Sequence, residues 1–147
     1  MNENYPPVSF HYVVSFNGIS GKTVDTQFQS VSGLSVEVET ELVKEGGENR
    51  FTHLLPVRSK YSNLVLKRGM VTDTDLIGWF TDTFDTMIVR PVSITISLLN
   101  EEHNPLTSWN VVHAWPKKWS VSDLDAEKSA IAIETLELHY QRFSIIR

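Results

Sequence analysis

Three glutamates at alternate positions have the spacing in this sequence that most directly suggests chemistry. Glu37, Glu39 and Glu41 alternate with valine, threonine and leucine, so on a strand they share one face, about 6.6–7 Å apart between neighbours. Paired carboxylates at such distances can cut glycosides. A solvated strand face would carry the same stripe, and no other pattern indicates a cleft around it. A hydrolase that loses its activity on Glu39→Gln stays one alternative.

Patterns that would bind a phosphate or a metal are incomplete. The stretch Gly18-Ile19-Ser20-Gly21-Lys22-Thr23 ends like a phosphate-binding loop, but Phe16 stands where that motif needs its first glycine. The residues that follow alternate like a strand rather than a helix. The five histidines show no spacing that would place two on one helix face, and the chain has no cysteine. We therefore expect no catalytic residue, no metal site and no cofactor.

One segment in the second half of the chain combines tryptophans with lysines. Trp115 and Trp119 enclose a proline and two lysines, a combination that can stack on a sugar or on a single-stranded nucleic acid. Packing explains the combination more simply, with Trp109, Trp115 and Trp119 anchoring a strand to the core and the lysines lying over the rings. A carbohydrate-binding β-sandwich module is the alternative function that this segment keeps open.

Alternation with a period of two dominates the chain and predicts strands with one buried face. The last predicted strand changes phase near Glu134-Thr135, which indicates a bulge there or two faces buried in turn. That strand would be about 45 Å long, enough to serve two sheets or two subunits. Pro116 is expected to interrupt the strand before it or to mark its edge. The predicted strands cover 8–16, 27–31, 34–43, 63–68, 92–98, 106–115 and 129–142.

One amphipathic helix is predicted over residues 73–84. Leu76, Ile77, Phe80 and Phe84 form a single apolar stripe that would face a core. Gly78 inside the helix costs about 1 kcal/mol relative to alanine. The fold class is therefore mainly β, a sandwich or barrel of about seven strands with one flanking α-helix, in a single domain over 1–147.

Amino-acid composition excludes fewer functions than the motifs and patterns do. The 147 residues include 13 basic and 18 acidic side chains, a formal net charge of −5, which makes a generic binder of phosphate backbones a poor fit. No apolar stretch is long enough to span a membrane, and the N-terminal residues do not resemble a signal peptide. We expect synthesis in a cytoplasm and no stable membrane association.

The segment 43–60 differs from the strands around it. Its first half is polar and glycine-rich, and apolar residues follow before Pro56. It can be a solvated hairpin tip, or an extending arm whose apolar root binds a neighbouring molecule.

Five stretches of the sequence are specific when they are taken together and in this order: Phe28–Leu34, Glu45–Arg50, Tyr61–Gly69, Trp109–Trp119 and Ile133–Leu138. Together they resemble the inner tube protein of contractile tails, a family of myophage tail tubes and bacterial injection particles. Relatives commonly carry a smaller aromatic residue at the position of Trp115. The Gly-Gly-Glu-Asn-Arg tip is closer to injection particles than to many phages.

The resemblance implies a structural subunit rather than an enzyme. Six such subunits form a ring whose inner strands join into one barrel, and the rings stack into a hollow tube. A sheath contracts around the tube and drives it, with its spike, through a target envelope. The implied partners are sheath, baseplate, spike and tape-measure proteins, with effector protein or DNA as cargo in the lumen. Assembly is expected in a bacterial cytoplasm, into a phage tail or a tail-like particle.

The resemblance also assigns roles to residues. Glu37, Glu39 and Glu41 become candidates to line the channel. The arm becomes the stacking element between rings, in which local basic groups must meet acidic ones because every copy carries a net charge of −5. The candidate contact residues of this arm are Lys44, Glu45, Gly46, Gly47, Glu48, Asn49, Arg50, Arg58 and Lys60.

Overall fold

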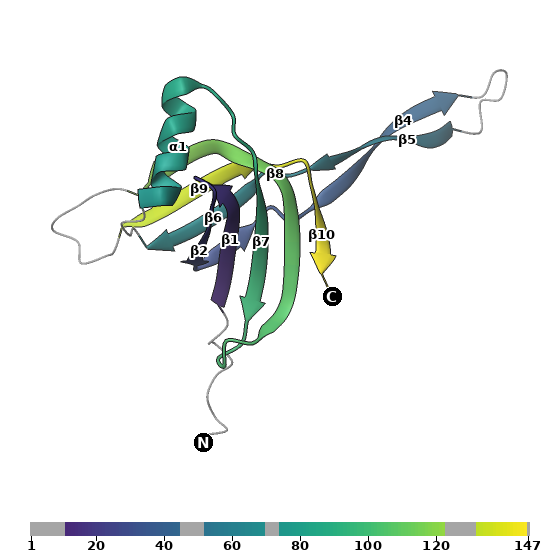
Figure 1. Cartoon of the computed structure of the whole chain (residues 1–147). Helices are drawn as coiled ribbons and strands as arrows, with labels where there is room; N and C mark the ends of the chain where they lie inside the picture. The colour runs from purple at the N-terminus through teal and green to yellow at the C-terminus, as the bar shows by residue number, and fades with distance from the viewer. Residues whose placement is uncertain (1–10, 45–51, 70–73, 123–131, 147) are drawn as a thin grey trace.

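The computed structural model describes residues 11–44, 52–69, 74–122 and 132–146. The mainly β class with one flanking helix is confirmed (Figure 1). The described residues form ten strands rather than about seven. The predicted strand at 27–31 falls on two strands, the segment 43–60 contains a strand that was not predicted, and the predicted strand at 129–142 is followed by a separate short strand. The elements are β1 (His11–Ile19), β2 (Lys22–Phe28), β3 (Ser30–Ser32), β4 (Val36–Lys44), β5 (Thr52–Tyr61), β6 (Leu64–Gly69), α1 (Thr74–Thr86), β7 (Val92–Leu99), β8 (Pro105–Val121), β9 (Ile133–His139) and β10 (Arg142–Ile146).

The long strand β8 joins two sheets. Its first part pairs with β7 and β10, in a sheet that continues through β1 to β2. Its last part pairs with β9, in a sheet that continues through β6 to β3. β8 curves from one sheet into the other (Figure 1). His113 has a positive φ of 56° beside a shift in the β7–β8 register, as expected of a bulge that bends a strand.

Two expectations about these strands differ from the structure. Pro116 does not interrupt β8, which continues to Val121. Pro116 is buried opposite Leu138 of β9, beside a register shift and beyond the residues of β8 that pair with β7 and β10, a position that tolerates the missing amide hydrogen. The C-terminal segment is not one long strand, because Gln141 turns the chain and its N–H donates to the carbonyl of Val112 at 2.9 Å. β9 and β10 therefore join different sheets.

The core is filled by the inward residues of both sheets and by one side of α1. Leu76, Trp79 and Phe80 of the helix are buried, and the ring centroids of Trp79 and Phe16 lie 6.0 Å apart. Phe84, expected in the apolar stripe, is 38% exposed. Its ring packs edge-on against Phe80, and Trp79, which the predicted stripe did not include, is buried in the core.

β9 needs no bulge to explain its change of phase. Its pairing with β6 is regular, and Glu134, Leu136 and Leu138 all point inward and are buried. The apparent shift arises because a carboxylate occupies an inward position that hydropathy assigns to an apolar residue. No helix among the described residues is long and apolar enough to cross a membrane.

Candidate functional site: the arm and the surfaces around it

The hairpin of β4 and β5 projects from the rest of the fold as an arm (Figure 1). The ladder runs antiparallel from Val36 opposite Tyr61 to Lys44 opposite Thr52, with a bulge that leaves Val57 between the partners of Glu39 and Thr40. The predicted tip residues Glu45, Gly46, Gly47, Glu48, Asn49 and Arg50 lie outside the described residues. β4 and β5 form a separate two-stranded sheet, an arrangement that is marginal in water without packing against something else.

One face of the arm is apolar and exposed. Val36, Val38, Leu42 and Leu54 are each half or more exposed, with Leu54 at 63%. Alternation in this segment predicted a half-buried strand, and the prediction fails along the arm because the chain has left its own core. Leu34, before β4 begins, still packs against the core. An apolar face of this kind marks an interaction surface.

The opposite face pairs charges across the two strands. Glu37 lies opposite Lys60 and Glu39 opposite Arg58, whose Nε is 2.7 Å from Glu39 Oε2. Glu41 lies opposite Leu55. The glutamate stripe is therefore largely offset by a basic stripe, and the ion pair is exposed, so it adds little stability.

The root of the arm is held by aromatic rings. Tyr61 contacts Tyr140 and Phe143 with ring centroids 5.6 and 5.5 Å away. The Tyr140 hydroxyl donates to the carbonyl of Gly33 at 2.8 Å. Gly33 has a φ of 94°, and a Cβ there would lie 1.8 Å from the Asn63 carbonyl oxygen, so only glycine fits this position. The aromatic cluster was not foreseen, since its members are far apart in the sequence.

The Tyr140 hydroxyl makes the fold sensitive to alkaline pH. Burial raises the pKa of Tyr140 to about 12 from the usual 10.0. Because the folded state holds the proton more tightly, this stabilisation is complete below about pH 10 and is lost as pH rises through about 12. We expect Tyr140→Phe to lower Tm at neutral pH, through loss of the hydrogen bond to Gly33, and to reduce the further fall of Tm between about pH 9 and 12. If calorimetry finds the same fall of Tm with rising pH in Tyr140→Phe and in the wild type, this expectation is contradicted.

The three tryptophans expected as anchors occupy different environments. Trp109 and Trp119 are partly buried against the core. Trp119 also donates from Nε1 to Glu134 Oε1 at 2.7 Å. Trp115 is half-buried and its ring packs on His139, with centroids 5.1 Å apart. Both lysines between Trp115 and Trp119 are exposed.

A buried ion pair behind Trp119 was not foreseen from the sequence. Arg68 and Glu134 face each other across β6 and β9, exposed by only 3% and 0%, with Arg68 Nε 2.8 Å from Glu134 Oε2. The Arg68 guanidinium carbon lies 5.2 Å from the centroid of the Phe28 ring. This pair and Trp119 connect β6, β8 and β9 beneath the surface.

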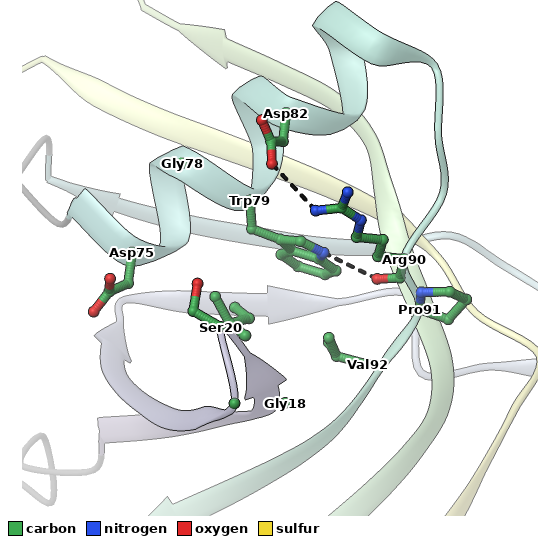
Figure 2. Close-up of a pocket in the computed structure, with 11 residues that line it drawn as sticks. Gly18, Ser20, Asp75, Gly78, Trp79, Asp82, Arg90, Pro91 and Val92 are labelled. Atoms are coloured by element: carbon green, nitrogen blue, oxygen red, sulfur yellow. Dashed lines mark hydrogen bonds and ion pairs between the residues drawn. The ribbon is translucent and has the colours of Figure 1, made fainter.

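A groove of about 460 Å³ lies between α1, the β1–β2 turn and the residues that lead into β7 (Figure 2). Its floor is Trp79, whose indole N–H donates to the carbonyl of Arg90 at 3.0 Å. The glycines of the loop that resembles a phosphate-binding motif line this groove, but the residues after them form β2 and not a helix. The arrangement therefore lacks the helix N-terminus that such a motif places at a phosphate.

The surfaces described so far suit assembly better than chemistry. Within the described ranges, no group of three or more histidine or acidic side chains is placed to hold a metal ion. The glutamate stripe lies on an exposed arm and Glu39 is committed to Arg58. Large exposed apolar areas instead lie on the arm and beyond the end of α1.

Comparisons with known proteins agree with an assembly role. Residues 8–144 match the family described as T4-like virus tail tube protein gp19. A chain from the cryo-EM structure of the anti-feeding prophage baseplate, 6-fold symmetrised, is 34% identical with a TM-score of 0.80, covering 99% of this chain and 97% of that one. A chain of the PVC extracellular contractile injection system, in a sheath-tube complex in the extended state, is 28% identical with a TM-score of 0.78, covering 98% and 93%.

A more distant likeness supports the fold alone. Hcp1 from Flavobacterium johnsoniae is 15% identical with a TM-score of 0.58, covering 92% of this chain and 94% of that one. Functionally curated protein sequences give no match. None of the matches supports carbohydrate binding. The chain belongs to the T4-like virus tail tube protein family and is a structural subunit of a contractile injection system or phage tail tube.

Proposed function

We propose that six copies of this chain close into a ring and that the rings stack into a hollow tube. The observation that carries the proposal is the arm: a two-stranded hairpin that leaves its own fold with both faces exposed. Such a hairpin is stabilised when another copy covers it. The six-fold symmetry of the baseplate structure that holds a 34% identical chain supports the number of copies.

The open strand edges favour closure into a ring. Within the described residues, β2, β3 and β10 end their sheets with one side unpaired in the single chain. Unpaired edges invite uncontrolled association, and a closed ring removes them. In this assembly Glu37, Glu39 and Glu41 remain candidates to face the lumen, with Arg58 and Lys60 beside them to moderate the charge.

The tube acts mechanically and catalyses nothing in this proposal. A sheath surrounds it, as the sheath-tube complex of the PVC relative suggests, and sheath contraction drives the tube and its spike through a target envelope. Baseplate and tape-measure proteins set where the tube starts and how long it grows. The lumen conducts effector protein or DNA. Assembly takes place in a bacterial cytoplasm, and the extracellular systems among the relatives favour a released tail-like particle.

Imaging the purified chain tests this function. We expect negative-stain micrographs to show annular rings and stacked tubes, and light scattering to show a species about six times the 16.7 kDa of one chain. Deleting Glu45–Arg50 should leave a folded subunit and abolish the stacked tubes, because the predicted stacking tip is removed. Tubes of normal length from the deletion variant would show that the arm tip is not needed for stacking. A chain that remains monomeric at every concentration would contradict the ring.

A further inference from the structure

The groove beside α1 is preformed and carries more negative than positive charge. Asp75, Gly78 and Asp82 line its helix side, as residues at i, i+3 and i+7 share one face. Arg90 lines the other side, with Nη1 3.4 Å from Asp82 Oδ2, and its carbonyl holds the Trp79 indole (Figure 2). Both Asp82 and Arg90 are more than 60% exposed. Two carboxylates and one guanidinium therefore line an open surface.

Gly78 leaves open space at this helix face. A Cβ built at Gly78 meets no atom within 4 Å, so packing within the chain does not require glycine. Glycine nevertheless weakens a helix interior relative to alanine. One use of a glycine is to let another backbone or side chain come close to the helix.

An apolar rim adjoins the groove beyond the end of α1. Met87, Ile88 and Val89 are exposed by 81%, 55% and 42%, and they lead directly into Arg90. The last turn of α1 contains no basic residue. This combination suits a binding segment that carries cations beside apolar side chains.

Strand β5 of the arm has that composition, and the glutamates of β4 lie opposite its two basic residues. Leu54, Leu55 and Val57 of β5 are each about half exposed or more, and Arg58, 72% exposed, follows them with Lys60 two residues on. We propose that the groove and its rim bind the β4–β5 arm of a second copy of this chain. The inference rests on the proposed tube function and names where the arm binds. Groove and arm are different surfaces, so the contact is head-to-tail and can close a ring or continue along a stack.

Cross-linking tests the contact directly, because the chain has no cysteine and every thiol would be engineered. We expect tubes of Val57→Cys/Ile88→Cys, treated with a short bismaleimide, to give a ladder of cross-linked copies in denaturing gels. The matched control is Val57→Cys/Leu106→Cys, since Ile88 and Leu106 are exposed to a similar extent, by 55% and 51%. Equal ladders in the two variants, or none in the first, would overturn the assigned binding site.

Gly78→Gln and a charge exchange provide independent tests. Gly78→Gln should raise the Tm of the subunit by a few °C through better helix propensity, yet lower the pelleted tube fraction about tenfold by filling the groove. Arg58→Glu should also lower that fraction, and Asp82→Lys added to it should restore part of the loss.

The two proposals fail in different ways. If Gly78→Gln and Arg58→Glu form tubes as the wild type does, the arm does not bind in the groove, while the tube function stands. A wild-type chain that forms neither rings nor tubes would overturn both.

Discussion

Glu134→Leu is expected to lower the free energy of unfolding by about 3–5 kcal/mol, the usual loss when one partner of a buried ion pair is removed. Glu134 is fully buried and accepts from both Arg68 Nε and Trp119 Nε1. Its loss leaves the Arg68 guanidinium, 3% exposed, without that carboxylate. For a chain of this size the change corresponds to a fall in Tm of about 10 °C or more. Urea or thermal unfolding of the subunit measures it.

The double variant Arg68→Met/Glu134→Leu is the matched control. Replacing both charges with apolar side chains removes the buried guanidinium, so most of the stability should return. The Trp119 indole still lacks its acceptor, and about 1–3 kcal/mol of the loss should remain. A double variant no more stable than Glu134→Leu would show that the cost comes from cavity formation and not from the separated charge.

The sequence predicts where the strands and the helix lie better than it predicts what covers their apolar faces. Alternation finds the segments of β1, β4 and β7, and the apolar spacing finds α1 to within two residues at each end. The same alternation assigns a buried face to β4, where the structure has an exposed arm. Periodicity reports that one face is apolar, and it holds no information on whether this chain or another copy covers that face.

Charged residues in the core are the second limit. Glu134 reads as a break in the pattern of β9, because hydropathy places carboxylates at the surface. Its partner Arg68 lies 66 residues away in the sequence, and no local signal joins the two. Tyr61, Tyr140 and Gly33 at the arm root are also far apart in the sequence, and only the fold brings them together.

The largest effect on assembly is expected from charges placed on the apolar face of the arm. Leu42 and Leu54 lie opposite each other in the ladder and are exposed by 67% and 63%. Leu42→Glu/Leu54→Glu should leave the Tm of the subunit nearly unchanged, because exposed substitutions of this kind usually alter stability by less than about 0.5 kcal/mol. The same change should abolish tubes.

The size of that effect follows from what each leucine contributes when a neighbouring copy covers it. Burying one leucine is worth about 1.5–3 kcal/mol, so losing two per copy raises the concentration needed for assembly by at least about 100-fold. Leu42→Met/Leu54→Met keeps the apolar area and should still form tubes, which separates loss of the contact from general disturbance of the hairpin. If sedimentation finds tubes of the glutamate variant at the wild-type concentration, the apolar face is not covered in the assembly and the arm binds through its charged face.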